Sequence, residues 1–484
     1  MLSFLILFTL ICGILGVLFL PDNVIKDQTK LYKTISISSC ALLSSFVCFF
    51  LSILKWLTFN NNTAKFQDIT VLGIPLGIDG ISLYFIILTT ILFPICLLIS
   101  WKSTIHSKFF LSLFLFLELL LILVFIVIDL LWFYIFFEAV LIPITLIIGI
   151  WGSRSRKVKA SIYFFIFTLL GSLIILTGII YIYTVTGTTI YLSLLSYSFT
   201  PTEEKWLWLA FFLYFSVKIP IIPFHIWLPE AHVEAPTIGS VILAGILLKL
   251  GVYGFLRYSL PLFPQASLFF APIINTICLI GVFYSSLTAI RQTDLKRIIA
   301  YTSIAHINLV VIGIFSFNIY GVYGCVIQSL SHGFVSSSLF FLIGTLYDQQ
   351  HTRLYLHYGG LTHIIPLFSI FLLCFTIANI ALPGTSSFIG EFLLLLGIFH
   401  VSPIAAVLGA SSLVWGSIYS LWLLNRIVYG NLKVQYLSKF KDLSPIEIFC
   451  FSFLFIIVIF LGFFPEIIIS DLRVILDKSI SFCK

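Results

Sequence analysis

The sequence predicts an all-α polytopic membrane protein with about 14 transmembrane helices, built around two inverted five-helix repeats. Three observations support this fold class. Of the 484 residues, 60% are hydrophobic and only 9% are charged, which excludes a water-soluble chain. Apolar stretches of membrane-spanning length follow one another along the chain. Two of these stretches, five spans apart, are interrupted by helix-breaking residues.

The apolar stretches set the expected helices. A window of about 20 residues finds spans near residues 2–20, 34–57, 79–100, 109–128, 130–152, 160–184, 206–228, 236–258, 268–290, 298–316, 317–345, 364–398, 403–428 and 446–469. The first span has neither the basic leader of a secretory signal nor the Arg/Ser-rich pattern of a transit peptide. We therefore expect it to be the first membrane helix.

The seventh and twelfth spans differ from the others. The seventh contains Pro220 and Pro223, and the twelfth is over-long and contains ALPGTSSF from Ala381 to Phe388. Proline and glycine free backbone groups that lipid cannot satisfy, so such a segment must be buried in protein or line a wet cavity. We expect helices 7 and 12 to be broken.

The spacing of the broken helices predicts the repeat. An offset of five spans makes them cross the membrane in opposite directions, which is the arrangement of an inverted repeat with working residues near the midplane. The expected division is residues 1–108 for helices 1–3, 109–258 for the first repeat (helices 4–8), 259–430 for the second (helices 9–13), and 431–484 for helix 14 and the tail.

The basic residues predict the orientation. Loops after odd-numbered helices hold most of the Lys and Arg residues, including the RSRK run from Arg154 to Lys157. The positive-inside rule places these loops on the matrix or cytoplasmic face, so both termini are expected on the opposite face. This asymmetry accounts for most of the net charge of +7, and no nucleic-acid partner is expected.

The sequence shows no redox or metal motif. Its nine cysteines are scattered, mostly in apolar runs, without a C-x-x-C pair or a histidine at metal-ligand spacing. A glycine-rich nucleotide loop is also not apparent. We expect the cysteines to be small buried residues, and any redox chemistry to occur in another subunit.

Ionisable residues within the spans suggest a function. A charged group near the bilayer centre costs at least about 2.5–3.5 kcal/mol, so such groups are usually paired or used. Acids, bases and histidines in one membrane protein point to a proton relay. The residues concerned are Glu118, Glu138, Lys218, Lys249, His306, His332 and Glu391.

These residues carry different weight. Glu138 and Lys218 are a structural or a functional ion pair, and we favour the functional one. Lys249 has no counter-ion nearby in the sequence, which favours a proton carrier. His306 and His332 are equally compatible with hydrogen-bonded core and with a relay. Glu391 follows the Gly-containing break, where the chain can be hydrated, and we favour a function there.

Four further residues are secondary candidates for the proton path. His225 and His232, with Glu230 and Glu234, lie at the end of helix 7 and form either a proton entrance or a solvated turn. Glu118 and Asp129 remain open between function and structure. Asp129 falls in a short link between two spans, so we expect it near the interface.

Several long motifs resemble a known family. They include LGIDGISLYFIILTT (76–90), DLLWFYIFFEAVLIPITLIIGIWGSR (129–154), FSVKIPIIPFHIWLPEAHVEAPTIGSVILAGILLKLGVYGFLRY (215–258), IRQTDLKRIIAYTSIAHINL (290–309), LSHGFVSSSLFFLIGTLYDQQHTR (330–353) and IANIALPGTSSFIGEFL (377–393). Together they resemble the antiporter-like membrane subunits of respiratory complex I, of the subunit 4 type. Glu391 supports that type, since the sibling subunits carry lysine there.

The resemblance implies a role for each residue. Glu138 and Lys218 would be a coupled pair, and Lys249 a central relay passing charge past His306 and His332 towards Glu391. The chain would pump protons in the mitochondrial inner membrane without a cofactor of its own. FMN, iron–sulfur clusters and ubiquinone would belong to other subunits. Its partners would be the sibling chains 2 and 5 and membrane lipids.

The sequence departs from the family pattern at one place, and it leaves two rival functions open. YDQQHTR has Gln349 and Gln350 where an arginine is usual, and we expect altered surface contacts with an intact relay. A stand-alone cation/proton antiporter would use the same machinery. A purely structural membrane subunit is the second rival.

Overall fold

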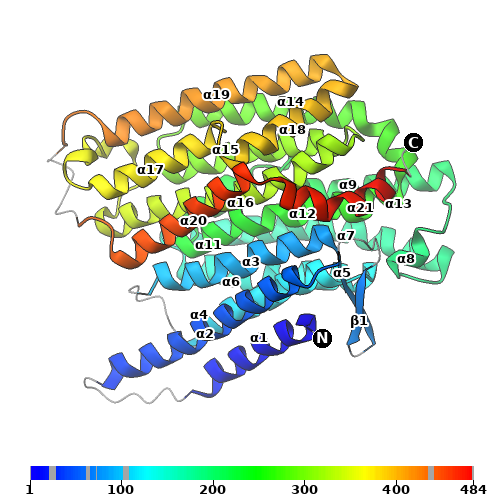
Figure 1. Ribbon diagram of the computed structural model, residues 1–484, viewed down its shortest axis with the longest axis horizontal. Coiled ribbons are helices and arrows are strands. Elements are labelled where there is room, and N and C mark those ends of the chain that lie inside the picture. Colours follow the sequence, from blue (N-terminus) through cyan, green and yellow to red (C-terminus); the bar gives the residue numbers. More distant parts are fainter. Residues whose placement is uncertain are drawn as a thin grey trace.

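Parallel and antiparallel helices make up most of the structure, a computed structural model that describes residues 2–20, 29–60, 66–71, 73–101, 108–433 and 441–481 (Figure 1). In this part of the chain, 12 helices or helix runs are long and apolar enough to cross a membrane. They are α1 (Leu2–Phe19), α2 (Thr29–Leu57), α3 (Gly80–Ile99), α4 (Lys108–Ile126), α5 (Leu130–Ala139) with α6 (Leu141–Trp151), α7 (Lys157–Thr186), the run Thr237–Leu262, α14 (Pro264–Arg291), α15 (Leu295–Ile314), α16 (Ile319–Gln350), α19 (Pro403–Val428) and α20 (Pro445–Phe463). The helical prediction is confirmed.

The two predicted broken helices are also found. The seventh consists of α9 (Pro201–Lys218) and α10 (Trp227–Glu234), and the twelfth of α17 (Pro366–Asn379) and α18 (Ser386–Val401). Pro220 and Pro223 lie in the first interruption, where proline nitrogens cannot donate to the helix. In the second, Gly384 has a φ of 97°, a left-handed value that favours glycine.

The broken helices begin at opposite ends of the molecule. The start of α9 lies beside the start of α14, since the Ala266 amide donates to Glu204 at 3.0 Å. The start of α17 lies beside Asp442, which accepts from the Leu367 and Phe368 amides at 3.1 and 3.2 Å. Asp442 precedes α20 near the end of α16, at the far end from the start of α14 (Figure 1). The two broken helices therefore run in opposite directions, as their spacing in the sequence predicted.

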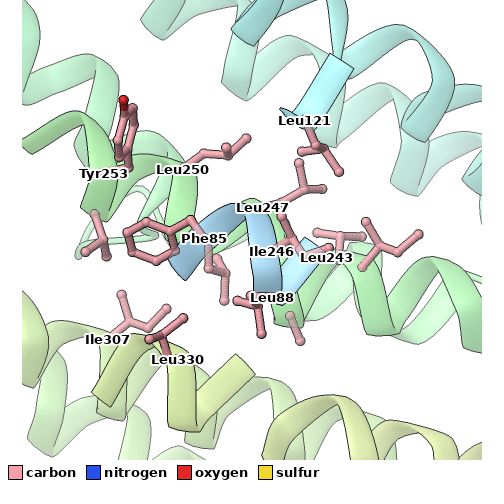
Figure 2. Close-up of a cluster of buried hydrophobic side chains, with 14 of the residues drawn as sticks. Phe85, Leu88, Leu121, Leu243, Ile246, Leu247, Leu250, Tyr253, Ile307 and Leu330 are labelled. Atoms are coloured by element: carbon pink, nitrogen blue, oxygen red, sulfur yellow. The ribbon is translucent and has the colours of Figure 1, made fainter. Parts of the chain in front are cut away.

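The run Thr237–Leu262 and helix α16 are the most deeply buried of these spans. The run contains α11 (Thr237–Ile242), the π-helix η1 (Leu243–Leu247), α12 (Leu248–Gly254), the π-helix η2 (Phe255–Ser259) and α13 (Leu260–Leu262). Figure 2 shows leucine and isoleucine side chains of this run packed against Phe85 and Leu88 of α3, and against Ile307 and Leu330 on neighbouring helices. Lys249 therefore lies in the middle of the hydrophobic core, between two π turns, which often mark functional sites.

A small β-hairpin was not predicted from the sequence. Strands β1 (Gln67–Val71) and β2 (Ile74–Ile78) pair antiparallel, with Val71 opposite Ile74. The next residue, Asp79, caps α3 by accepting from the Ser82 amide and pairs with Arg257 of η2 at 2.6 Å. We call this side of the molecule the hairpin end and the opposite side the cavity end.

The C-terminal part closes the hairpin end. Helix α21 (Glu466–Ser481) packs against α3, α13 and α16. Asp471 accepts a hydrogen bond from the Tyr84 hydroxyl at 2.6 Å and from the Trp56 indole at 3.3 Å, so it ties α21 to α3 and α2. The short helices are α8 (Tyr191–Leu194), η3 (Tyr355–His357) and η4 (Leu361–His363).

The departure at Gln349 has a structural consequence. Its side-chain amide donates to the Lys441 carbonyl at 2.9 Å and accepts from the Lys441 amide at 3.2 Å. This two-point contact joins the end of α16 to the segment before α20.

Candidate proton pathway

Glu138 and Lys218 meet between α5 and α9. The Lys218 Nζ atom lies 4.0 Å from Glu138 Oε1, and the ammonium also stands over the Phe137 ring, 4.9 Å from its centroid. The Tyr214 hydroxyl donates to the same carboxylate oxygen at 2.7 Å. The predicted pair is therefore brought together, with a tyrosine that the sequence analysis did not single out.

Lys249 is fully buried in α12. Its ammonium donates to the carbonyl of Ala244 in the preceding π turn and lies 2.9 Å from Nδ1 of His332 on α16. An ammonium donates only, so His332 must present Nδ1 as an acceptor whenever Lys249 is charged. The partner that the sequence could not supply for Lys249 thus comes from a helix 83 residues away.

Two histidines connect Lys249 to Glu391. The His332 and His306 rings are 5.7 Å apart between centroids. Nδ1 of His306 lies 2.8 Å from Glu391 Oε1, and Gln328 Nε2 donates to that same oxygen at 3.0 Å. The four side chains Lys249, His332, His306 and Glu391 come from α12, α16, α15 and α18 and form a polar row of two hydrogen-bonded pairs whose imidazole rings lie next to each other.

Hydroxyl groups of the second broken helix reach the same row. Ser386, at the start of α18, donates to Ser331 at 2.8 Å, directly beside His332 in the sequence. Other serines near the histidines mostly bond to their own helix: Ser303 to Ile299, Ser329 to Val326 and Ser336 to His332 itself. Of these serine contacts, the Ser386–Ser331 hydrogen bond joins two helices, whereas the others stay within one helix.

The secondary histidine candidates are both buried. His232 is fully buried and stacks on Phe340 with centroids 4.6 Å apart; neither ring nitrogen has a hydrogen-bond partner among the described residues. Lys249 and Lys296 are the two cations near enough to interact with it. His225 packs edge-on against Tyr284, with centroids 5.2 Å apart.

The secondary acidic candidates lie elsewhere. Glu118 is fully buried on α4, and its interactions with other titratable groups are with the thiols of Cys48 and Cys96. Asp129 caps α5 through the Leu131 amide at 2.8 Å and accepts from Thr189 at 2.9 Å. The contacts of Asp129 are those of a structural cap, and those of Glu118 place it outside the polar row.

A polar cavity of about 590 Å³ opens at the cavity end. Its charged lining comes from the ends of several helices: Lys296, Asp348, His351, Arg353 and Glu447. Lys296 is fully buried and donates to the Ala235 carbonyl at 2.9 Å and to the Ser240 hydroxyl at 3.2 Å. The sequence analysis missed Lys296 because it stands beside Arg297 at the start of a span, where an ordinary loop cation is expected. Its burial could not be inferred from that position.

Two arginines beside this cavity, Arg353 and Arg297, connect neighbouring segments of the chain. Arg353 donates to the Val233 carbonyl and to the Ser153 hydroxyl, while Arg297 pairs with Glu230 at 2.7 Å. Burial raises the pKa of the Glu234 carboxyl above its usual range, although the nearby Arg154 and Arg353 oppose this. Glu230 and Glu234 thus lie where the sequence analysis expected an entrance or a solvated turn.

The chemistry available here is proton exchange. An amine and an imidazole, and an imidazole and a carboxylate, lie within hydrogen-bond distance of each other in a largely apolar core. Among the described residues, no group of three or more His, Cys, Asp or Glu side chains could hold a metal ion.

Comparisons with known proteins agree with this arrangement. The family model described as NADH:quinone oxidoreductase/Mrp antiporter, TM, matches residues 127–415. The chain is 50% identical to NADH-ubiquinone oxidoreductase chain 4 of Arabidopsis thaliana over 95% of this chain and 94% of that protein. It is 51% identical to the same chain of Chondrus crispus over 90% of each.

Solved structures show the same fold. A chain of respiratory complex I from Thermus thermophilus superposes with a TM-score of 0.89 and 27% identity, covering 100% of both chains. A chain of the Mrp complex from Dietzia sp. superposes with a TM-score of 0.87 and 16% identity, covering 100% of this chain and 99% of that one. The second likeness concerns the fold alone.

Proposed function

Because this chain belongs to the family of NADH-ubiquinone oxidoreductase chain 4, we propose that it translocates protons in the membrane arm of respiratory complex I through its buried polar row. Glu138, Lys218, Lys249, His332, His306 and Glu391 are the residues of this relay. The observation that carries the proposal is the row from Lys249 to Glu391, in which Lys249–His332 and His306–Glu391 lie at 2.9 and 2.8 Å and the two imidazole rings between them are 5.7 Å apart.

The Glu138–Lys218 pair supplies the electrostatic control. Moving a unit charge from about 4 to 8 Å from its partner changes the pair energy by roughly 2 kcal/mol at an effective dielectric near 20. A change of that size alters the protonation of a neighbouring group more than tenfold. A charge change in an adjacent subunit that moves Lys218 relative to Glu138 would thus drive proton uptake and release at Lys249.

Protons reach the relay from the cavity end. Lys296 lines the polar cavity, and the buried ring of His232 interacts electrostatically with both Lys296 and Lys249. His232 is therefore the proposed link between the cavity and Lys249, while His225 is a weaker candidate because its ring packs on Tyr284. Glu118 and Asp129 are not needed by this path.

The proposal also includes the orientation of the chain in the membrane, its two halves and its partners. The Arg-rich cavity end faces the matrix of the mitochondrion, and both termini face the intermembrane space. Residues 109–258 and 259–430 act as the two inverted halves. Chains 2 and 5 are the expected neighbours together with membrane lipids, and FMN, iron–sulfur clusters and ubiquinone are carried by other subunits.

A free cation/proton antiporter is the second candidate, because the Mrp chain has the same fold. To decide, native membranes are solubilised in mild detergent and separated on a native gel that is stained for NADH dehydrogenase activity. Co-migration of this polypeptide with that activity is the expected result. A small separate band without NADH dehydrogenase activity would favour the antiporter.

A further inference from the structure

We propose that Tyr214 is a positioning residue of the Glu138–Lys218 pair: its hydroxyl holds the carboxylate of Glu138 when Lys218 moves away, and so allows the pair to open. The inference rests on the proposed function, because it assigns a task within the relay. It concerns a residue outside the polar row described above.

The geometry shows two donors aimed at one oxygen. Tyr214 donates to Glu138 Oε1 at 2.7 Å, whereas Lys218 Nζ stands 4.0 Å from the same atom. A charged hydrogen bond from nitrogen to a carboxylate normally measures about 2.7–2.9 Å. The phenol therefore occupies the close position, and the ammonium is held roughly 1 Å beyond bonding distance.

Helix α9 presents both donors to Glu138. Tyr214 and Lys218 are four residues apart, so they lie one turn above the other on the same face. Tyr214 is fully buried, and its ring packs against Phe137 and Phe215 with centroids 5.1 and 5.3 Å apart. The phenol cannot follow a moving lysine, because these contacts fix its ring.

Lys218 also has an alternative to the carboxylate. Its ammonium stands over the Phe137 ring at 4.9 Å and over the Tyr214 ring at 5.9 Å. Cation–π contacts of this length stabilise a cation that has left its water. Both members of the pair thus keep a partner when they separate: Glu138 keeps the phenol, and Lys218 keeps the aromatic faces.

This arrangement lowers the cost of opening the pair. The Glu138 side chain is 18% exposed, and a mostly buried carboxylate that loses its only partner is destabilised. Removing a hydrogen bond to a charged group shifts such an equilibrium by about tenfold or more. The other titratable group that interacts electrostatically with Glu138 is Tyr134, one turn earlier on α5. Tyr214 is therefore the donor that keeps the Glu138 carboxylate hydrogen-bonded when Lys218 has moved away.

The test is Tyr214→Phe in the intact complex, reconstituted in vesicles, with proton pumping per NADH oxidised and the cryo-EM structure as readouts. The variant keeps the ring and its packing but removes the donor. We expect Lys218 Nζ to move to hydrogen-bond distance of Glu138 Oε1 and pumping to fall by about tenfold. An unchanged 4.0 Å separation with normal pumping would overturn the proposal.

A matched control is available. Tyr181 also donates to a carboxylate, Glu203, at 2.8 Å, but at an exposed site near the hairpin end. Tyr181→Phe removes the same kind of bond and is expected to leave pumping unchanged. An equal loss in both variants would mean that the effect is not specific to the ion pair, which also overturns the proposal.

Lys218→Ala separates this inference from the proposed function. Normal pumping in Lys218→Ala would contradict the relay itself, whereas lost pumping in Lys218→Ala with an unaffected Tyr214→Phe would contradict only the role of Tyr214. If the Tyr214→Phe complex does not assemble, the structure of Lys218→Ala still tests the role of Tyr214. The proposal requires Glu138 to remain hydrogen-bonded to Tyr214, and a carboxylate that turns away from the phenol contradicts it.

Discussion

At the scale of single residues, the relay consists of groups that would be costly to bury unless they were paired. The sequence predicted Glu138, Lys218, Lys249, His306, His332 and Glu391 because ionisable side chains within apolar spans are conspicuous. It could not predict their contacts, since Lys249 and His332 are 83 residues apart and Glu391 and His306 are 85 apart. Tyr214 and Lys296 were missed because neither stands out from its local pattern.

Glu391 is expected to act through its charge. Glu391→Gln keeps the size of the side chain and can still hydrogen-bond to Gln328 and His306, but it cannot carry a proton. We predict normal assembly of the complex and a fall in proton pumping of at least about tenfold. Pumping is measured in reconstituted vesicles against NADH oxidation.

A control for Glu391 lies on the surface of the same chain. Glu203→Gln removes an exposed carboxylate at the start of α9 that caps the helix. It is predicted to leave pumping unchanged. Pumping at the wild-type level in Glu391→Gln would remove Glu391 from the relay.

At the scale of elements, interrupted and distorted helices position the relay. The breaks in helices 7 and 12 were predicted because proline and glycine, when clustered within a span, leave backbone groups that lipid cannot satisfy. The π turns on either side of Lys249 were not predicted, because LAGILLKLGVYGFL has an ordinary helical composition and the distortion comes from packing. The hairpin was missed for a similar reason: its strands have only five residues each.

Close packing of α16 and α18 brings Glu391 to Gln328, which donates to the carboxylate oxygen that His306 also contacts. A Cβ atom at Gly390 would lie 2.8 Å from the backbone nitrogen and Cα of Gln328, so α18 would have to shift. Gly390→Ala is predicted to destabilise this contact by about 1–3 kcal/mol and to lower pumping, because the neighbouring Glu391 moves with the helix. Thermal denaturation of the purified complex and pumping assays check both effects.

Gly416→Ala on α19 provides the comparison. Its Cβ would meet no atom closer than 3.5 Å, the Tyr419 hydroxyl, which is an ordinary contact. This variant should match the wild type in stability and in pumping. If Gly390→Ala behaved in the same way, the close approach of α16 and α18 would not be what places Glu391.

At the scale of the whole molecule, the two ends differ. The hairpin end carries the β-hairpin, while the cavity end has a polar cavity lined by charged side chains. Loop charge alone predicted which end faces the matrix, because Lys and Arg residues gather in loops at the cavity end. The cavity itself could not be predicted, since its lining comes from helix ends far apart in the sequence.

Site-directed labelling tests the orientation. Ser155 is exposed at the cavity end and Thr202 is exposed at the hairpin end. With a membrane-impermeant thiol reagent, Ser155→Cys is predicted to react only in inverted inner-membrane vesicles, and Thr202→Cys only in right-side-out ones. Labelling in the reverse pattern would place the cavity on the intermembrane-space side and require protons to be taken up there.

Lys249 provides the most direct test of the whole account, because every step of the proposed path passes through it. The measurement is the number of protons pumped per NADH oxidised by the complex carrying Lys249→Ala, reconstituted in vesicles. Lys159→Ala, at an exposed position on α7, is the control. The account predicts an assembled complex in which Lys249→Ala loses pumping through this subunit and Lys159→Ala does not. Unchanged pumping in assembled Lys249→Ala would contradict it and favour a purely structural subunit.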